Sequence, residues 1–330
     1  MKIFLTGSEG FIGSHLLEAL IKNKHQVKAL IQYNSFGNVG HLEYLDKKYK
    51  KKYTKVFGDI RDSGFLEKNI KGCEIVINLA ALIAIPHSYD AVESYIDTNI
   101  KGTFNVLSSS IKNKVKQIIH TSTSEVYGSA VKIPMDENHR LLGQSPYAAT
   151  KISADQLCLS FFHSYKTPVT ILRPFNTFGP RQSLRAVIPS IILQCLNNKK
   201  NIYLGDFTTT RDFNYVDNIT YAYLKAIDNK KSIGEVINVG SNYEIKIIEL
   251  FNLIKKITKS KVELVIDKKR LRPKNSEVLR LNCDAKKAHK ILKWKPKFAH
   301  RKGFIEALKL TIKWYEKNYD FSKNSNTYMK

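Results

Sequence analysis

Short apolar runs typical of buried strands recur along the first half of the chain. Between the strands, apolar residues recur at helical spacing. Strands that alternate with helices form a parallel sheet covered on both faces, so this half predicts a doubly wound α/β domain. The predicted strands are 2–6, 26–32, 53–57, 74–79, 116–121 and 168–173, and the predicted helices are 11–22, 63–70, 90–112 and 146–165.

The pattern becomes less regular after Pro174. The elements predicted there are helices near 185–198, 215–228, 246–257, 284–291 and 301–318, and strands at 202–204, 235–239 and 262–266. They are too irregular for a second doubly wound sheet and indicate a smaller lobe, partly interleaved with the first domain. The predicted division is 1–175 plus about 212–240 for the first domain, and 176–211 with 241–330 for the smaller lobe. The polar tail after Asp320 is expected to fray.

Composition is that of a globular protein, with 330 residues, 43% of them hydrophobic and 25% charged. No stretch approaches the ~20 apolar residues of a membrane span. The chain opens with a strand and a glycine-rich turn, without the pattern of a signal peptide. We therefore expect a cytoplasmic protein with no membrane partner. The four cysteines are far apart and the nine histidines show no ligand spacing, so reduced thiols and no metal site are expected.

The net charge is +25, from 54 Lys and Arg against 29 Asp and Glu. Such a charge can indicate nucleic-acid binding. Here the lysines are scattered, with one short run at 47–52, and no basic tail or nucleic-acid motif is present. We expect no nucleic-acid partner, and note that a basic surface also attracts an anionic small substrate.

A glycine-rich turn follows the first strand directly. Gly7, Gly10 and Gly13 form G-x-x-G-x-x-G, and Phe11 and Ile12 begin the following helix. Without Cβ atoms, the glycines allow a tight turn and the close approach of a pyrophosphate to the helix N-terminus. Because the motif lies between a strand and a helix, it predicts a dinucleotide cofactor; the alternative is a purely structural turn.

The end of the second strand leaves the choice between NAD and NADP open. A carboxylate there would hold the ribose of NAD, and an arginine would hold the 2′-phosphate of NADP. The sequence runs from Gln32 to Ser35 with neither residue type. Ser35 and the nearby backbone could hold a phosphate, so NADP is slightly favoured. Asp59 and Ile60 could flank the adenine; alternatively, Asp62 caps the next helix and Asp59 is a turn residue.

Tyr147 and Lys151 lie four residues apart on a predicted helix that Ser145 and Pro146 open. This spacing puts both side chains on one face of the helix. A tyrosine with its ordinary pKa of about 10 is a poor base at neutral pH. A lysine one turn away, beside a positive nicotinamide, favours the phenolate and brings the tyrosine into a useful range. The pair is therefore predicted to be reactive rather than simple helix surface.

The combined motifs resemble the extended short-chain dehydrogenases/reductases, a family that acts on nucleotide sugars. The motifs are TGSEGFIG at 6–13, NLAA at 78–81, Asn99, Thr123, YAATK at 147–151 and RPFNTFGPR at 173–181. The resemblance covers nearly the whole chain and implies a Rossmann domain with a small C-terminal substrate lobe. It also implies cofactor contacts from Leu79, Ala80, Ala81, Asn99 and Thr121, and from Tyr147 and Lys151.

Glu125 separates this chain from the epimerases that it resembles, which usually carry a small or hydroxyl residue there. The 4,6-dehydratases carry a glutamate, and the pair Ser124 and Glu125 is similar to the GDP-mannose type. In the chemistry that this implies, Tyr147 takes the 4-hydroxyl proton and Thr123 hydrogen-bonds that hydroxyl. Oxidation at C4 acidifies the C5 hydrogen, which Glu125 removes while water leaves C6. The alternative is a glutamate that caps a local turn.

The resemblance also implies substrate contacts. Arg211 and Arg272 match positions where arginines grip a diphosphate, since guanidinium groups suit phosphate oxygens; each could instead form a surface salt bridge. The other residues implied are Asn176, Arg185, Val187 and His87, although a histidine in a loop is more often simply solvated.

The strings at 81–103, 121–128 and 179–192 look most like the 4,6-dehydratase of the legionaminic acid branch. This resemblance implies GDP- or UDP-N-acetylglucosamine as substrate. The alternatives are a UDP-glucuronate decarboxylase, a nucleotide-sugar 4-epimerase and a non-catalytic dinucleotide-sensing protein. The helices at 90–112 and 146–165 would expose apolar faces in a lone chain, so a homodimer is expected.

Overall fold

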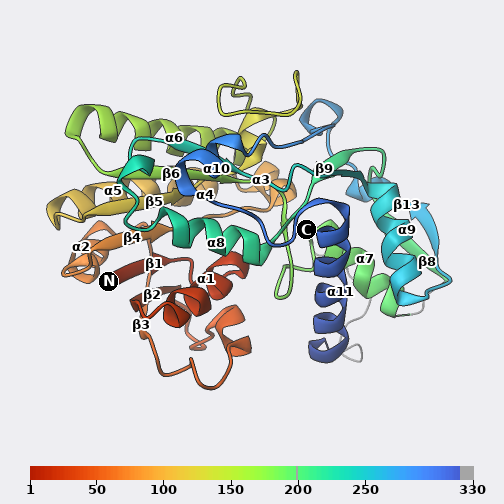
Figure 1. The fold of residues 1–330 in the computed structure, drawn as a ribbon, viewed down its shortest axis with the longest axis horizontal. Helices are drawn as coiled ribbons and strands as arrows, with labels where there is room; N and C mark the ends of the chain where they lie inside the picture. Colours follow the sequence, from red (N-terminus) through yellow and green to blue (C-terminus); the bar gives the residue numbers. More distant parts are fainter. Residues whose placement is uncertain (198–199, 320–330) are drawn as a thin grey trace.

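A seven-stranded parallel sheet forms the centre of the computed structural model, which describes residues 1–197 and 200–319 (Figure 1). The strand order is β11-β6-β5-β4-β1-β2-β3. The sheet confirms the predicted doubly wound α/β fold of the Rossmann type. Its strands are β1 Lys2–Thr6, β2 Gln26–Gln32, β3 Thr54–Gly58, β4 Ile75–Asn78, β5 Gln117–Thr121, β6 Val169–Pro174 and β11 Val236–Val239.

Helices cover both faces of the sheet, because its central strands are buried on both sides. On one face, α1 (Phe11–Lys22), α8 (Val216–Ala226) and α10 (Lys286–Leu292) share one buried cluster with the sheet. On the other face lie α2 (Ser63–Ile70), α5 (Gly102–Lys112) and α6 (Pro146–Tyr165). With both faces of the central strands covered, the ends of these strands remain open to a ligand.

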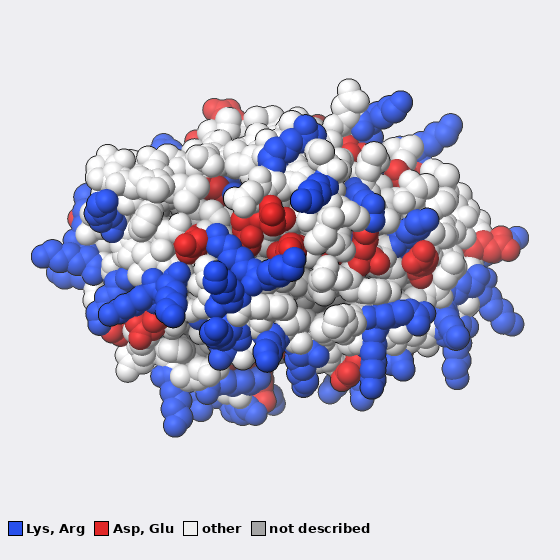
Figure 2. Space-filling view, turned by 45° about the horizontal axis from the view of Figure 1, so that its top comes forward, with Lys and Arg blue, Asp and Glu red and all other residues white. Residues whose placement is uncertain are grey.

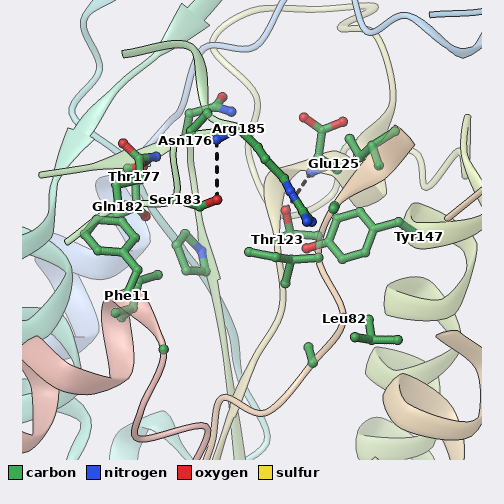
Figure 3. A pocket seen from close by; sticks show the side chains of 18 of the residues that line it. Phe11, Leu82, Thr123, Glu125, Tyr147, Asn176, Thr177, Gln182, Ser183 and Arg185 are labelled. Atoms are coloured by element: carbon green, nitrogen blue, oxygen red, sulfur yellow. Dashed lines mark hydrogen bonds between the residues drawn. The ribbon is translucent and has the colours of Figure 1, made fainter. Parts of the chain in front are cut away.

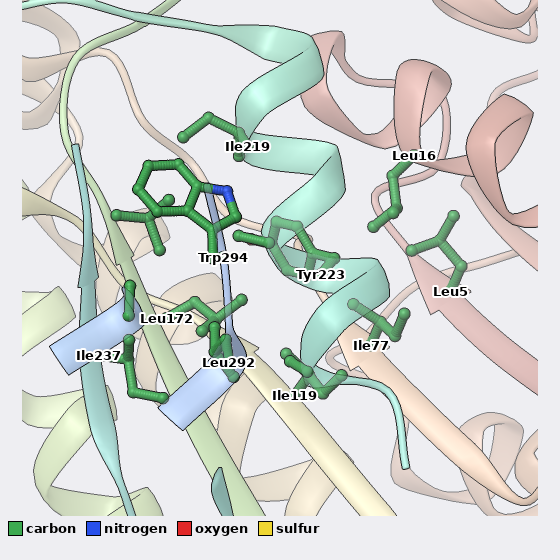
Figure 4. Close-up of a cluster of buried hydrophobic side chains, with 14 of the residues drawn as sticks. Leu5, Leu16, Ile77, Ile119, Leu172, Ile219, Tyr223, Ile237, Leu292 and Trp294 are labelled. Carbon is green, nitrogen blue, oxygen red and sulfur yellow. The ribbon is translucent and has the colours of Figure 1, made fainter. Parts of the chain in front are cut away.

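The cluster on the first face includes a fully buried tryptophan from late in the chain. Trp294 packs with Tyr223 and Leu172 (Figure 4), and its indole N–H donates to the Asn218 carbonyl at 2.8 Å. The segment 278–294, which the sequence assigned to the smaller lobe, thus contributes to the core of the sheet domain.

The single helix predicted over 90–112 is interrupted in the structure. It consists of α4 (Val92–Tyr95), a π-helical turn at Ile96–Lys101 and α5, preceded by α3 (Ile85–Asp90). The widened turn presents Asn99, whose side chain accepts from the Leu82 N–H at 2.9 Å and donates to the Leu82 carbonyl at 3.0 Å. The loop after β4 is therefore held by the helix that follows it.

The remaining elements form the smaller lobe, with its own buried cluster. Three helices pack around three two-stranded pairs, β7–β10, β9–β12 and β8–β13. The helices are α7 Val187–Leu196, α9 Ile247–Thr258 and α11 His300–Asn318; the strands are β7 Thr177–Phe178, β8 Asn201–Leu204, β9 Thr210–Asp212, β10 Asn214–Tyr215, β12 Glu244–Lys246 and β13 Glu263–Ile266. The predicted frayed tail lies outside the described residues.

The surface carries lysine and arginine side chains over much of the face in Figure 2, with carboxylates between them. Across 1–197 and 200–319, no helix has both the length and the apolar character to cross a membrane. Cys73, Cys158, Cys195 and Cys283 are each buried and unpaired, as expected for reduced thiols.

Candidate active site

A pocket of about 720 Å³ opens at the carboxyl ends of the sheet strands, between the sheet and the smaller lobe. Most of the predicted site residues line it. They are Gly7, Gly10, Phe11, Ile12, Gly13, Gln32, Asp59, Ile60, Leu79, Ala80, Ala81, Thr121, Thr123, Ser124, Glu125, Tyr147, Lys151, Asn176, Arg185, Val187, Arg211 and Arg272. Ser35, His87 and Asn99 are not among the lining residues. His87 is exposed, and Asn99 instead braces the loop after β4.

The glycine-rich turn leaves no room for a side chain at Gly7 or Gly13. Gly7 has a φ of +63°, and a Cβ there would lie 2.8 Å from the Ala80 nitrogen. A Cβ on Gly13 would lie 2.0 Å from the Gly7 carbonyl oxygen. The following helix has no side-chain cap at Gly10, so its first N–H groups remain available to an anion. The turn therefore fits the pyrophosphate of a dinucleotide.

A carboxylate that the sequence analysis missed lies beside this turn. Glu9, inside the glycine motif, accepts a hydrogen bond from the Gln32 N–H at 2.9 Å. Its other oxygen, Oε2, is buried without a hydrogen-bond partner among the described residues. Burial raises the pKa of Glu9. Its position within the motif was visible in the sequence, but its contact with the end of β2 was not.

At the end of β3, the structure shows the alternative arrangement that the sequence left open for Asp59 and Asp62. Asp62 caps α2 by accepting from the Phe65 N–H, and Asp59 accepts from the Arg61 N–H in a tight turn. Asp59 also forms an ion pair with Arg61 at 2.6 Å. Asp59 is therefore a turn residue and also, together with Ile60, part of the pocket lining.

Thr123, Tyr147 and Lys151 meet at one end of the pocket, which we call the tyrosine end. Ser145 caps α6 by accepting from the Ala148 N–H at 3.1 Å, and so starts the helix that carries the other two residues. The Tyr147 hydroxyl is hydrogen-bonded to the Thr123 side chain. The Lys151 ammonium donates to the Thr121 carbonyl at 2.7 Å. The predicted pairing of these residues is thus present.

Without a cofactor, the surroundings of Tyr147 disfavour its charged form. Its pKa is raised, because burial is the largest cause and outweighs the hydrogen bond from Thr123. The negative charges of Glu125 and Asp155 act in the same direction. Burial also lowers the pKa of Lys151. The protein alone therefore does not favour the phenolate, and a positive charge from a bound cofactor would have to supply that bias.

A buried polar network lies directly behind Lys151. Asp155, one turn further along α6, accepts from the Ser122 hydroxyl at 2.7 Å and from the Arg173 Nε at 2.9 Å. His120 lies 3.8 Å from Asp155, and burial lowers its pKa well below the usual value. The network holds α6 against β5 and β6, because His120 and Arg173 lie in these strands and Ser122 directly follows β5.

Glu125 lies at the tyrosine end and is only 8% exposed. Its backbone N–H donates to the Thr123 hydroxyl at 3.2 Å, and in Figure 3 its carboxylate points away from the Tyr147 phenol. The carboxylate is close enough to Arg211 for its charge to raise the pKa of that residue, against the larger effect of burial. Glu125 therefore lies between the tyrosine end and the arginines of the smaller lobe.

The two arginines expected to bind a diphosphate share a carboxylate that the sequence analysis missed. Arg211 and Arg272 pair with the same Glu277 oxygen at 3.0 and 3.5 Å. All three residues line the pocket. Both arginines thus form salt bridges, which was the alternative to a diphosphate contact, but these salt bridges lie within the pocket rather than on the outer surface.

Arg185 extends from the loop before α7 toward the tyrosine end (Figure 3). Its charge opposes the rise in the pKa of Tyr95 that burial causes. The Tyr95 ring in turn packs edge-on against the Tyr147 ring, with 6.3 Å between the ring centroids. The resemblance had placed Arg185 with the element over the nucleotide base. Asn176 also lines the pocket, with a buried side-chain oxygen that has no partner among the described residues.

A doubly wound sheet with this glycine turn and this Tyr–Lys helix defines a short-chain dehydrogenase/reductase. The family model described as GDP-mannose 4,6 dehydratase matches residues 4–306. The chain therefore belongs to that family, within the NAD-dependent epimerase/dehydratase group of extended short-chain dehydrogenases/reductases.

The curated relatives of similar length include proteins named for three different activities. The chain is 30% identical to dTDP-D-glucose 4,6-dehydratase of Homo sapiens, covering 98% of this chain and 92% of the relative. It is 34% identical to a putative UDP-glucose 4-epimerase of Methanocaldococcus jannaschii, covering 96% and 99%. It is 31% identical to UDP-N-acetyl-alpha-D-glucosaminuronate decarboxylase of Bacillus cytotoxicus, covering 95% and 97%. The chain is thus an enzyme of the nucleotide-sugar dehydratase and epimerase kind.

Among solved structures, the chain is similar to DesIV, a dTDP-glucose 4,6-dehydratase from Streptomyces venezuelae that contains NAD. The TM-score is 0.86 at 27% identity, and the match covers 96% of this chain and 98% of DesIV. Dependence on NAD or NADP is supported in this way, whereas the slight preference for NADP inferred from Ser35 finds no support.

Replacing Gly13 by alanine is expected to abolish tight cofactor binding, because the new methyl group would overlap the Gly7 carbonyl. The nucleotide released from purified protein is expected to fall at least about tenfold. Gly64→Ala is the control, since its Cβ meets only the Asp62 carboxylate at 3.6 Å. Full nucleotide content in Gly13→Ala would contradict the assignment of this turn.

His120 is expected to make the protein less stable in acid. Because its folded-state pKa lies below the unfolded value of about 6.5, the unfolded chain binds more protons, and stability falls as the pH decreases below 6.5. In urea unfolding at pH 7 and pH 5, His120→Gln is expected to lose less stability than the wild type. His163→Gln, on the exposed end of α6, is the control. Equal losses in wild type and His120→Gln would contradict this prediction.

Proposed function

We propose that this protein is a nucleoside-diphosphate-sugar 4,6-dehydratase that converts its substrate to a 4-keto-6-deoxy sugar. The observation that carries the proposal is the position of Glu125, a buried carboxylate in the same pocket as Thr123 and Tyr147. Oxidation and reduction at C4 need only the tyrosine and its partners. Removal of a C5 hydrogen needs an additional base, and a carboxylate fits that need.

In the proposed reaction, Tyr147 takes the proton of the sugar 4-hydroxyl, and Thr123 orients that hydroxyl through the hydrogen bond it already makes with the tyrosine. Lys151 holds the ribose hydroxyls of the cofactor from its buried position behind Thr121. When bound, the nicotinamide would supply the redox chemistry between C4 and C6 of the sugar. The phenolate form of Tyr147 is disfavoured until that positive ring is present. Removal of the substrate proton therefore depends on cofactor binding.

Glu125 then removes the C5 proton, which the adjacent C4 ketone has made acidic, and the same carboxyl group protonates the departing C6 hydroxyl. The C5–H electrons form the C5–C6 double bond as water leaves. When C6 is reduced, C5 takes up a proton, which balances the one that Tyr147 removed from the 4-hydroxyl. Ser124, which lines the pocket beside it, is a second candidate for a hydrogen bond in this step. One carboxyl group thus acts as base and acid in turn.

For the substrate, we propose GDP- or UDP-N-acetylglucosamine, used in making legionaminic-type surface sugars. The support is the resemblance of 81–103, 121–128 and 179–192 described above. Arg211 and Arg272 are proposed to bind the diphosphate, with Asn176 contacting the sugar phosphate and Val187 the base. Both arginines line the pocket and form charge-assisted pairs that a diphosphate could replace.

Two enzymatic alternatives share the C4 oxidation. A UDP-glucuronate decarboxylase would release CO₂, and Arg185 near the tyrosine end is a cation that a C6 carboxylate could meet. A 4-epimerase would retain the 6-hydroxyl, and would leave Glu125 without a role in the reaction. A non-catalytic dinucleotide sensor is disfavoured because Thr123, Tyr147 and Lys151 are all present in one pocket.

Glu125→Gln is expected to lower dehydration at least about 100-fold, because the amide cannot take the C5 proton. Purified protein would be incubated with GDP- and UDP-N-acetylglucosamine, and the loss of water followed by mass spectrometry. The retained nucleotide content would show that the pocket is intact, and Glu43→Gln on the exposed surface is the matched control. Near-normal turnover in Glu125→Gln would reject the role proposed for Glu125.

We also propose that the protein is a cytoplasmic homodimer that pairs through α5, α6 and the π-helical turn. Apolar side chains are exposed there, including Ile96, Phe104 and Ile111. Phe104 stacks edge-on with Phe161 of α6, and Phe161 with Tyr165, which makes one continuous aromatic surface across the two helices. Continuous exposed apolar surface of this kind favours association.

Phe104→Glu is expected to weaken the dimer at least about 100-fold, because a carboxylate would be buried at the interface. Leu310→Glu on α11 is the matched control, since Leu310 is 43% exposed and Phe104 is 45% exposed. Sedimentation would distinguish the 37.8 kDa chain from a species of twice that mass. A wild-type monomer at micromolar concentration would contradict the proposal.

A further inference from the structure

The carboxylate of Glu9 lies where the second strand of the sheet ends, although Glu9 belongs to the glycine-rich turn. Its Oε1 accepts from the backbone N–H of Gln32, the last residue of β2, at 2.9 Å. Its own carbonyl accepts from the His41 N–H at 2.9 Å, which holds the turn against the segment after β2. Glu9 lines the same pocket as the glycines. A side chain 23 residues earlier in the sequence thus occupies the end of β2.

The end of β2 is where dinucleotide-binding folds distinguish the two nicotinamide cofactors. An acidic residue there accepts hydrogen bonds from the adenosine ribose hydroxyls of NAD, and a basic residue there holds the 2′-phosphate of NADP. In this chain the strand itself ends in Gln32 and supplies neither. Glu9 instead brings a carboxylate to the end of β2 from the glycine-rich turn.

We propose that Glu9 replaces the acidic residue missing from the end of β2 and makes the protein select NAD over NADP. The buried Oε2 of Glu9 has no donor among the described residues, and a ribose hydroxyl would supply one. A 2′-phosphate carries about −1.5 to −2 charges at neutral pH and would be repelled by the carboxylate at this site.

The surrounding charges do not offset that repulsion. Within the described pocket lining beside β2 and β3, the cation is Arg61, and it is already paired with Asp59 at 2.6 Å. Asp59 adds a second carboxylate to this side of the pocket. The adenosine end is therefore acidic, although the protein as a whole has a net charge of +25.

The test measures binding rather than turnover, so its outcome does not depend on the dehydratase reaction; it rests only on the use of NAD or NADP. The nucleotide released from purified wild-type protein would be identified chromatographically. After exchange of that nucleotide by dialysis, dissociation constants for NAD and NADP would be measured by calorimetry. We expect NAD to be released and to bind at least about tenfold more tightly than NADP.

Glu9→Gln keeps the size of the side chain and an acceptor oxygen but removes the charge. The NAD to NADP preference is expected to fall at least about tenfold in this variant, mainly through tighter binding of NADP. Glu43→Gln, an exposed carboxylate on the segment that follows β2, removes the same charge outside the pocket and is expected to keep the wild-type ratio.

Two results would overturn the proposal. One is NADP as the nucleotide released from the wild type, which needs no variant and holds even if Glu9→Gln fails to fold. The other is an affinity ratio in Glu9→Gln that is the same as in the wild type. A protein that selects NAD through Glu9 but removes no water from its sugar substrate would support this inference and reject only the proposed dehydration.

Discussion

A lysine ammonium buried inside the protein is the constraint on which the site depends. Lys151 is 3% exposed, and an uncompensated charge in such a place costs several kcal/mol. The cost is offset by the Thr121 carbonyl at 2.7 Å and by the charge of Asp155, which the Arg173 guanidinium holds in turn. These contacts join α6 to β5 and β6. Because Tyr147 is on the same helix face, the position of the phenol follows from the pairing of the lysine.

The same principle of paired charge extends into the smaller lobe. Arg211 is buried, and Glu277 and Glu125 both favour its charged form. If a diphosphate entered this region, the arginines would exchange one anionic partner for another. No further desolvation of the arginines would then be needed. These ion pairs keep the arginines of the pocket ordered. The two lobes on either side of the pocket have separate buried clusters.

At the opposite end of the pocket, backbone proximity rather than charge sets the geometry. The glycine turn lies so close to the end of β4 and to itself that only glycine fits at Gly7 and Gly13. The tight turn directs Glu9 toward the end of β2, where its carboxylate meets a backbone N–H. The four residues between β1 and α1 therefore form the close-packed turn and place the Glu9 carboxylate at the end of β2.

The sequence by itself determined the parallel sheet, most of its helices and many of the residues that line the pocket. Buried parallel strands are continuous apolar runs, and the four-residue spacing of Tyr147 and Lys151 puts them on one face in any helix. Only the tertiary structure decided the contact of Glu9 with Gln32, the bridge that Glu277 makes between two arginines, and the packing of 278–294 under the sheet. The π-helical turn around Asn99 belongs with these, because it depends on the loop after β4. Periodicity reports which face of an element is buried, whereas contacts between distant segments depend on how loops bring the chain back, and no local pattern encodes that.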